Sequence, residues 1–323
     1  MTELTVENRL SDNYLAIAMR ADVRAGLTAS PKRLRPVWFY DARGSALFEE
    51  ITRLPEYYPT RAERQILTAE AARIAAACPA TTLIELGSGS SEKTRLLITA
   101  LHDAGTLRRY VPVDVSPTAV LAAAEALRAD YPEVAVAAVV ADFTAHLDAL
   151  PGDGPRLIAF LGSTIGNFAP DERAAFLADI RRLLGPGDAL LLGTDLVKDS
   201  SVLIPAYDDA AGVTAEFNRN VLRVLNRELG ADFDLAGYEH VAVWDAANEW
   251  IEMRLRAVRG QTVKIPELDL VVEFAAGEEL RTEISAKFRR DGVAGELAAS
   301  GMELRHWWTD ADARFALALV VPR

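Results

Sequence analysis

Residues 83–94 read Leu83-Ile84-Glu85-Leu86-Gly87-Ser88-Gly89-Ser90-Ser91-Glu92-Lys93-Thr94. An apolar run of strand length leads into a turn with two glycines and then into a polar helix. Gly87 and Gly89 permit a positive φ and a close approach of a ligand to the backbone, and a helix start offers free N–H groups. The stretch therefore predicts a strand, a ligand-binding turn and a helix, although a plain tight turn would use the same glycines.

Three classes of cofactor use such turns. A phosphate-binding loop has glycine directly before Lys-Ser/Thr, whereas Glu92 precedes Lys93-Thr94 here, which excludes it. A dinucleotide fingerprint expects a third glycine or an alanine where Glu92 stands, which disfavours it. Of the three cofactor classes, S-adenosylmethionine (SAM) is therefore the one that the turn favours. An acidic Glu85 before Gly87 also suits a ligand that carries an ammonium and a sulfonium better than it suits a pyrophosphate.

Strands and helices alternate outward from this turn. Apolar strands are expected at 82–86, 110–114, 134–140, 157–161 and 189–194, and helices at 60–77, 92–102, 117–129 and 170–184. Thr60, with Glu63 three residues later, has the pattern of a capping box at the start of the first helix. Alternation with continuously apolar strands is typical of a parallel sheet covered on both faces.

The alternation stops after residue 195. A long helix is expected at 203–228, then short strands at 240–244, 250–258, 262–265, 268–274 and 281–288, a helix at 293–299 and strands at 304–308 and 315–321. Before residue 60, helices are expected at 10–29 and 46–51. A chain of 323 residues suggests about two domains. The fold class is therefore α/β, a Rossmann-like sheet with a second α+β domain.

Acidic residues follow two of the expected strands. Asp114 ends one strand, where a carboxylate can accept both ribose hydroxyls. Asp142-Phe143 follows the next strand, where a carboxylate can meet an adenine amino group and an aromatic ring can cover the base. An exposed acid and a helix cap are the alternatives for the two aspartates. Their place at successive carboxyl ends, where open α/β sheets bind ligands, favours a cofactor site.

Composition narrows the function classes. With 35 basic and 47 acidic side chains the net charge is −12, which disfavours nucleic acid. The single cysteine, Cys78, excludes a disulfide framework and a cysteine zinc site. The four histidines have no ligand spacing, so no metal is expected. No apolar run approaches the roughly 20 residues of a membrane span. We expect a cytoplasmic, monomeric protein that handles a small molecule.

Several longer motifs carry a resemblance to one family. They are Trp38-Phe39-Tyr40-Asp41, Leu54-Pro55-Glu56-Tyr57-Tyr58-Pro59-Thr60-Arg61, Glu85-Leu86-Gly87-Ser88-Gly89, Phe160-Leu161-Gly162-Ser163-Thr164-Ile165-Gly166-Asn167, Gly193-Thr194-Asp195-Leu196-Val197-Lys198-Asp199, Ala206-Tyr207-Asp208-Asp209, Phe217-Asn218-Arg219-Asn220 and Thr282-Glu283-Ile284-Ser285. With these the chain resembles the actinobacterial L-histidine Nα-methyltransferases of ergothioneine biosynthesis, over nearly its whole length. Ser90, Val37 and Ala286 depart from the family pattern, and none is an implied contact.

The resemblance implies a seven-stranded SAM-binding methyltransferase domain at 61–197 plus 287–323. It implies a second, substrate-binding domain at 1–60 plus 198–286 that closes over the first. The implied activity is transfer of three methyl groups from SAM to the α-amino nitrogen of L-histidine, with S-adenosylhomocysteine (SAH) as product.

The resemblance also implies individual residue roles. The implied cofactor-binding residues are Gly87, Ser88, Gly89, Lys93, Asp114, Asp142, Phe143 and Ser163. The implied substrate-binding residues are Phe48, Tyr57, Gly162, Asn167, Tyr207, Met253, Glu283 and Ser285, and the implied catalytic residues are Tyr40, Tyr57 and Asn167. Asn167 and Tyr207 would bind the substrate carboxylate, and Tyr57, Glu283 and Ser285 the imidazole.

The residues themselves agree with such a substrate. Glu283 and Ser285 lie two apart on an expected strand, so both point to one face and can converge on an imidazole nitrogen. A tyrosine of lowered pKa, a water chain or a carboxylate could each accept the amine proton. Methylation of another small amine or amino acid is the nearest alternative function. A nicotinamide oxidoreductase and a noncatalytic SAM-binding module are disfavoured by the missing third glycine and by the dense polar and aromatic loops.

Overall fold

The computed structural model describes residues 4–89, 91–147, 150–152 and 154–323. The chain divides into two compact units, each built from separated stretches. The first unit comprises Met1–Ser11, Pro59–Val197 and Phe288–Arg323, and the second comprises Asp12–Tyr58 and Lys198–Lys287.

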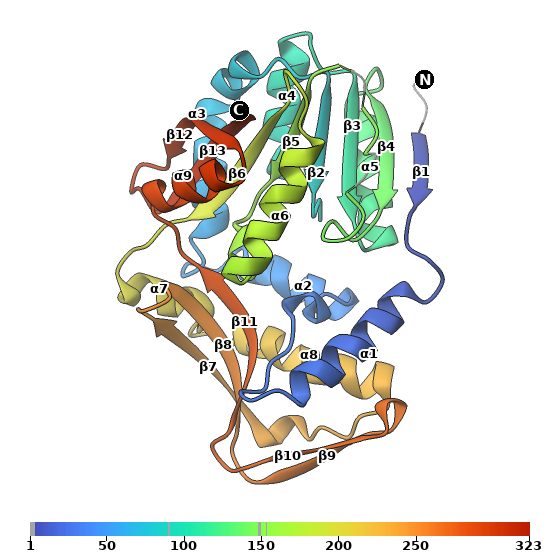
Figure 1. Ribbon diagram of the computed structural model, residues 1–323, viewed down its shortest axis with the longest axis vertical. Helices are drawn as coiled ribbons and strands as arrows, with labels where there is room; N and C mark the ends of the chain where they lie inside the picture. The colour runs from blue at the N-terminus through green and yellow to red at the C-terminus, as the bar shows by residue number, and fades with distance from the viewer. Residues whose placement is uncertain (1–3, 90, 148–149, 153) are drawn as a thin grey trace. The chain divides into compact units, whose positions relative to one another are not determined.

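The first unit is built on an eight-stranded sheet in the order β1-β4-β3-β2-β5-β6-β13-β12 (Figure 1). Its strands are β1 (Leu4–Asn8), β2 (Thr82–Leu86), β3 (Arg109–Asp114), β4 (Ala135–Val140), β5 (Arg156–Phe160), β6 (Ala189–Asp195), β12 (Met302–Thr309) and β13 (Phe315–Pro322). The six strands from β1 to β6 pair in parallel, and β13 and β12 add antiparallel pairs at one edge. The α/β prediction is confirmed.

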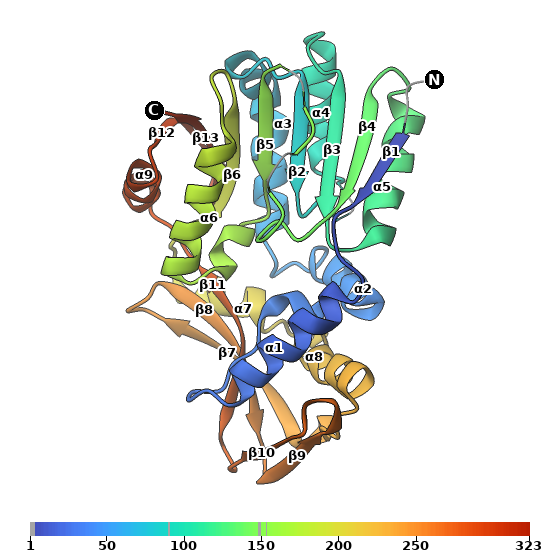
Figure 2. The same cartoon turned by 45° about the vertical axis from the view of Figure 1, so that its right-hand side comes forward.

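Helices cover both faces of this sheet. They are α3 (Pro59–Ala77), α4 (Thr94–Asp103), α5 (Pro117–Asp130), α6 (Pro170–Leu183) and α9 (Arg290–Ala299). Figure 2 shows α6 and α9 on one face and α3, α4 and α5 on the other. Every residue of β2 and β6 is buried, as expected for parallel strands between two helical layers. Within the described residues, no helix is long and apolar enough to cross a membrane.

Strand β1 was not expected, and it makes the sheet eight-stranded instead of seven-stranded. It pairs in parallel with β4 from Leu4↔Val136 to Asn8↔Val140. Four of its five residues are exposed, because it is an edge strand held by backbone hydrogen bonds, so it has no apolar signal. The pairing also brings residues 4–11 into the first unit, whereas the domain bounds implied by the family resemblance place them in the second domain.

Two helix predictions differ from the structure. Helix α3 begins at Pro59, so Thr60 lies inside the first turn and does not cap it. The helix expected at 203–228 is two helices, α7 (Ser200–Tyr207) and α8 (Val213–Leu229). Gly212, with φ +73°, precedes α8, and the Asp209 carboxylate accepts from Val213 N at 3.0 Å and Thr214 N at 2.7 Å. This start of a new helix has the side-chain capping that a continuous helix would not need.

The second unit is α+β, as expected. Besides α7 and α8 it contains α1 (Tyr14–Leu27), α2 (Ala42–Ile51), the three-stranded antiparallel sheet β11 (Glu279–Ala286), β8 (Trp250–Ala257) and β7 (Tyr238–Asp245), and the pair β9 (Gln261–Ile265) and β10 (Leu270–Phe274). Its core is separate from that of the first unit and includes Phe39, Phe217 and Leu255.

Candidate active site

The glycine turn follows β2 and has the expected backbone. Gly87 has φ +70° and Gly89 has φ +49°. The turn is fixed to the neighbouring strand, because the N–H groups of Gly87 and Ser88 both donate to Val113 O, at 2.8 and 3.2 Å. These conformations are readily available to glycine and disfavoured for other residues.

Glu85 anchors the turn from inside. Its buried carboxylate accepts from Ser91 Oγ at 2.9 Å and from the hydroxyls of Thr94 and Tyr110. Burial raises the pKa of Glu85 to about 7, despite these hydroxyl donors. The sequence suggested that Glu85 suits a cationic ligand, but its carboxylate instead ties β2 to β3 and to the start of α4.

The turn fits an adenosyl ligand. Ser88 Oγ is buried and has no hydrogen-bond partner among the residues that the structure describes, whereas most buried polar atoms in folded proteins have one. A Cβ at Gly89 would meet no described side chain or backbone within 4 Å beyond its chain neighbours, whereas one at Gly87 would lie 3.5 Å from the Phe143 ring. An unsatisfied hydroxyl, open space above the backbone and an adjacent aromatic ring are what a nucleoside with polar groups would use.

The two strand-end aspartates have different surroundings. The Asp114 carboxylate accepts from Gly89 N at 3.2 Å and Ser116 N at 3.0 Å, and burial raises its pKa. It therefore stands beside the glycine turn, as the sequence predicts. Asp142 Oδ1 accepts from Thr144 N at 2.8 Å and Thr144 Oγ1 at 2.6 Å, which is a local turn.

Partly buried Lys93 forms an ion pair with Glu63 that the sequence did not reveal. Glu63 on α3 is fully buried; its Oε2 pairs with Lys93 Nζ, and its Oε1 accepts from Gly162 N at 2.8 Å. A Cβ on Gly193 would lie 2.4 Å from Glu63 Oε1, so glycine is needed there. The predicted role of Glu63 in a capping box is therefore wrong: the carboxylate fixes Lys93 and the loop after β5.

That loop carries the other predicted residues of the first unit. Gly162 and Ser163 have φ +72° and +57°, and the 3-10 helix η2 (Thr164–Asn167) follows. Ser163 Oγ accepts from Asp195 N at 2.9 Å, which joins the loop to the end of β6. The predicted Gly162, Ser163 and Asn167 thus lie on one short segment at the carboxyl end of β5.

Aromatic side chains connect the predicted residues of the second unit. The Phe48 ring centroid lies 5.7 Å from that of Tyr40 and 6.1 Å from that of Tyr57, and Tyr57 lies 6.5 Å from Tyr207. Phe217 joins them, 5.5 Å from Tyr40 and 6.0 Å from Phe48. Phe217 belongs to the Phe217-Asn218-Arg219-Asn220 motif but is not among the predicted site residues.

Polar and apolar residues of the same unit meet on β8 and β11. Glu283 pairs directly with Met253, and Ser285 with Ile251, so all four lie on one face of the sheet. The register shifts between Arg281 and Glu283, after which the expected alternation of Glu283 and Ser285 holds. Tyr207 Oη lies 2.7 Å from Ser285 Oγ, which joins this face to the aromatic side chains.

Lys287, which the sequence analysis missed, lies against these hydroxyls. Its Nζ donates to Tyr207 Oη and to Ser285 Oγ, each at 2.8 Å, and it lies 4.7 Å from the centroid of the Tyr207 ring. The side chain is buried. Its place two residues after Ser285, on the same alternation, is the sequence signal that could have found it.

A buried histidine supports Tyr207 from behind. Asn218 Nδ2 lies 2.8 Å from His240 Nδ1, and His240 Nε2 lies 2.7 Å from the Tyr207 carbonyl oxygen. The amide donates to Nδ1, so Nε2 carries the proton and donates to the carbonyl. Burial lowers the pKa of His240, which favours this neutral form. Thr282 Oγ1 completes the network by donating to Asn218 Oδ1 at 2.6 Å.

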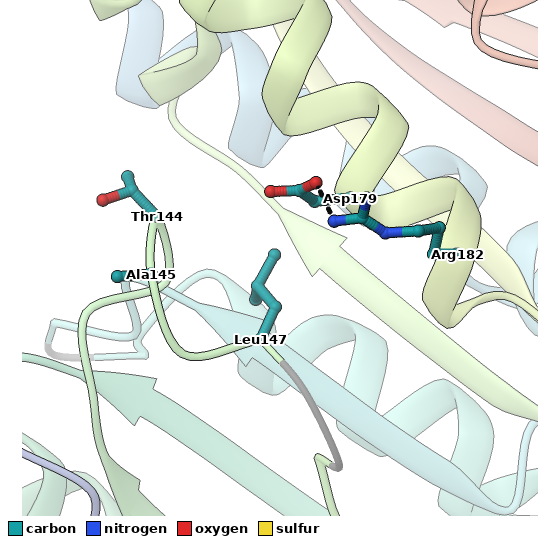
Figure 3. A pocket seen from close by; sticks show the side chains of 5 residues that line it. All are labelled: Thr144, Ala145, Leu147, Asp179 and Arg182. Atoms are coloured by element: carbon teal, nitrogen blue, oxygen red, sulfur yellow. Dashed lines mark hydrogen bonds and ion pairs between the residues drawn. The ribbon is translucent and has the colours of Figure 1, made fainter.

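A small cavity in the first unit lies next to Asp142, since Thr144, which binds the Asp142 carboxylate, is part of its lining. Thr144, Ala145, Leu147, Asp179 and Arg182 line it, and Asp179 and Arg182 form an ion pair at its rim (Figure 3). None of them is a predicted site residue. Among the residues that the structure describes, no group of three histidine, cysteine or acidic side chains is arranged to hold a metal ion.

Comparison with known proteins agrees with this geometry. A family model described as "Histidine-specific methyltransferase, SAM-dependent" matches residues 19–322. Histidine N-alpha-methyltransferase of Mycolicibacterium smegmatis is 57% identical over 318 residues, covering 98% of this chain and 99% of that protein. The protein of the same name from Mycobacterium tuberculosis is 54% identical over 316 residues, covering 98% of each chain.

A more distant fungal relative extends the comparison. Ergothioneine biosynthesis protein 1 of Neurospora crassa is 31% identical over 287 residues, which covers 86% of this chain and 32% of that protein. The match of the family model over nearly the whole chain, together with the two full-length relatives, decides the family. This chain belongs to the SAM-dependent, histidine-specific methyltransferases.

Proposed function

We propose that this protein transfers three methyl groups from SAM to the α-amino nitrogen of L-histidine and so makes Nα,Nα,Nα-trimethylhistidine for ergothioneine biosynthesis. The observation that carries the proposal is the match of the histidine-specific family over residues 19–322. The names of the full-length relatives and of the fungal ergothioneine protein point to the same reaction.

The proposed cofactor contacts all belong to the first unit. Backbone and hydroxyl groups of the glycine turn 87–89 would hold the cofactor, with Asp114 at the ribose and Phe143 against the adenine. Lys93 would meet the carboxylate of the cofactor's amino acid moiety, since an ammonium is a suitable donor there. Asp142 and Ser163 complete the proposed set.

The proposed substrate contacts include both hydrogen-bonding and aromatic groups. Tyr207 and Asn167 would bind the carboxylate, and Tyr57, Glu283 and Ser285 the imidazole. The remaining proposed substrate contacts are Phe48, Gly162 and Met253. A site that hydrogen-bonds an imidazole N–H rejects side chains that lack one, because its own buried polar groups would then be left unpaired.

Bound SAM supplies an electrophilic methyl group on a positively charged sulfur. The residues of this chain must hold the neutral amine, about 3 Å away and in line with the reacting bond. We propose Tyr40, Tyr57 and Asn167 as the catalytic residues. The tyrosines can accept a weak hydrogen bond from the amine, and their rings can stabilise the quaternary ammonium that forms.

Mass spectrometry tests this proposal directly. Incubation of the purified protein with SAM and L-histidine is expected to give products heavier by one, two and three methyl groups, with SAH formed in proportion. Parallel reactions with other amino acids and small amines test the nearest alternative. A mass gain on one of them, with none on histidine, would exclude the histidine proposal and keep the methyltransferase.

We also propose that the protein acts in the cytoplasm as a monomer and without nucleic acid. The net charge of −12 supports the last point, because a phosphate backbone would be repelled. Size-exclusion chromatography with light scattering tests the monomer: a mass near 35.1 kDa is expected.

A further inference from the structure

Tyr40 lies at the apex of a tight turn in the second unit. It follows the 3-10 helix η1 (Pro36–Phe39) and precedes α2. Its φ of −89° and ψ of +57° are close to those of an inverse γ-turn, and the Asp41 N–H donates to the Phe39 carbonyl oxygen at 3.1 Å, as this turn requires. Phe39 is fully buried, whereas Tyr40 is 46% exposed. The turn therefore directs the Tyr40 side chain out of the core.

Asn220, a buried residue of α8, holds both residues that flank Tyr40. Its Nδ2 donates to the Phe39 carbonyl oxygen at 3.2 Å and to Asp41 Oδ1 at 2.8 Å. A side-chain amide has two N–H groups, so these two acceptors use both of them. The reversed amide would place an oxygen against a carbonyl and a carboxylate, neither of which can donate to it. The surroundings therefore fix which way the amide points.

The Asp41 carboxylate is held by further donors. Oδ1 also accepts from Gly44 N at 2.8 Å, where it caps α2, and Oδ2 accepts from Arg227 at 2.7 Å. Burial raises the pKa of Asp41, but the hydrogen bonds from Gly44 N, Arg227 and Asn220 outweigh it and lower this pKa below its ordinary value. Asp41 is thus a carboxylate at neutral pH, which accepts and cannot donate.

The elements around the turn are packed closely against it. A Cβ on Gly44 would overlap the Phe39 carbonyl oxygen, so the first turn of α2 touches the carbonyl that Asn220 holds. Phe217 precedes Asn220 by three residues on α8, which places both on one face of the helix. The Phe217 ring meets that of Tyr40 edge-on, with centroids 5.5 Å apart. One helix therefore contacts the ring of Tyr40 and also fixes the backbone beneath it.

We propose that Asn220 is a positioning residue for methyl transfer, which fixes the direction of Tyr40 by holding the carbonyl before it and the carboxylate after it. The inference rests on the proposed function, in which Tyr40 is a catalytic residue that contacts the amine. Asn220 acts through Tyr40, and it is given no contact with substrate or cofactor.

Asn220→Asp tests the proposal with almost no change of shape. It replaces the donor by an oxygen, which faces the Phe39 carbonyl and the Asp41 carboxylate. We expect kcat for L-histidine to fall about tenfold, as the loss of one hydrogen bond to the reacting amine would cause. KM for L-histidine and SAH affinity by calorimetry should change less. A folded variant with the kcat of the wild type would overturn the proposal.

A double-mutant cycle with Tyr40→Phe separates positioning from a general structural role. Tyr40→Phe removes the hydroxyl that Asn220 is proposed to position. In this background Asn220→Asp should lower kcat by no more than about twofold. Equal factors in the two backgrounds would show that Asn220 acts independently of the Tyr40 hydroxyl and would overturn the proposal. So would a Tyr40→Phe variant with unchanged kcat.

Asn226→Asp is the matched control. Asn226 lies six residues later on α8, and its Nδ2 donates to the Phe233 carbonyl oxygen at 2.9 Å. Its replacement removes the same kind of contact and should lower the thermal unfolding midpoint without lowering kcat. A similar fall of kcat in Asn226→Asp and Asn220→Asp would assign the effect to a weakened helix and contradict the proposal.

If Asn220→Asp does not fold, Asn220→Ser is used, because a hydroxyl retains one donor and adds no charge. It should lower kcat about threefold in the wild-type background and not in Tyr40→Phe; equal losses would again overturn the proposal. Failure of the proposed function is distinct, since the wild-type protein would then leave L-histidine unmethylated. The same cycle is in that case measured with the amine that the protein does methylate.

Discussion

The glycine turn of the first unit and the polar and aromatic cluster of the second differ in the groups that they offer to a ligand. The turn offers mainly backbone groups: Gly87 and Gly89 have positive φ, and between them lies Ser88 Oγ, which no described residue hydrogen-bonds. The cluster presents side chains from separate elements, such as Tyr40, Tyr207 and Ser285. A common cofactor can be held by a short backbone motif, whereas selection of one substrate needs individually placed side chains.

The largest expected effect concerns the buried ion pair of the first unit. Glu63→Ala should lower the free energy of unfolding by about 3 kcal/mol, because it leaves Lys93 and the N–H of Gly162 without the carboxylate. Urea denaturation followed by circular dichroism measures it. Glu70→Ala, on the same helix, removes only the ion pair with the exposed Arg73 and should cost less than about 1 kcal/mol. Equal losses of stability in the two variants would mean that the contacts of Glu63 with Lys93 and Gly162 do not stabilise the first unit.

Glu85 makes the stability of the first unit depend on pH. Its pKa is about 7 in the folded protein and 4.5 as the ordinary value, so the folded state holds the proton more tightly. Its contribution is therefore favourable at low pH and is lost as the pH rises, by about 2 kcal/mol between pH 5 and pH 7. Glu85→Gln should lack this part of the slope when unfolding is measured at several pH values. Parallel pH profiles of variant and wild type would contradict the raised pKa.

Glu283→Ala tests the proposed substrate-binding side chains of the second unit. Loss of an acceptor for an imidazole N–H should raise KM for L-histidine by about tenfold to thirtyfold, about 1.4 to 2 kcal/mol, with a smaller change in kcat. The variant should also accept other amino acids better relative to histidine. Glu279→Ala is the control, since this residue of the same strand binds Arg254 and Arg256. Unchanged kinetics in Glu283→Ala would remove Glu283 from the substrate contacts.

The smallest expected effect separates backbone strain from cofactor binding. Gly89 and Gly105 both have positive φ, and within the described part of the chain a Cβ at either would meet nothing within 4 Å beyond the chain neighbours. Alanine at either position should cost about 1 kcal/mol of stability. Gly89→Ala alone should weaken SAH binding severalfold by calorimetry, because its methyl group would occupy the space above the turn. Equal SAH affinity in the two variants would contradict a backbone-built cofactor site.

The sequence predicts those features whose residues are contiguous, and it does not predict contacts between residues that are far apart in the chain. The buried strands and the glycine turn are contiguous, so their residues predict them directly. Strand β1 was not predicted, because backbone hydrogen bonds hold it at an exposed edge of the sheet and its side chains show no apolar pattern. Glu63 was misread because a local Thr-x-x-Glu pattern does not reveal a partner 99 residues away, at Gly162. Lys287 was missed because Tyr207 lies 80 residues away.

The division into units also has a consequence for how the protein is made. The chain passes between the units at residues 11–12, 58–59, 197–198 and 287–288, so neither unit is a continuous stretch. Strand β6 ends at Asp195, but the strand that covers its outer edge, β13, begins about 120 residues later, at Phe315. At roughly 5 to 20 residues per second, the ribosome needs on the order of ten seconds to supply it. Until then β6, which is buried in the folded protein, lacks its partner on that edge, so we expect this stage of synthesis to be prone to aggregation.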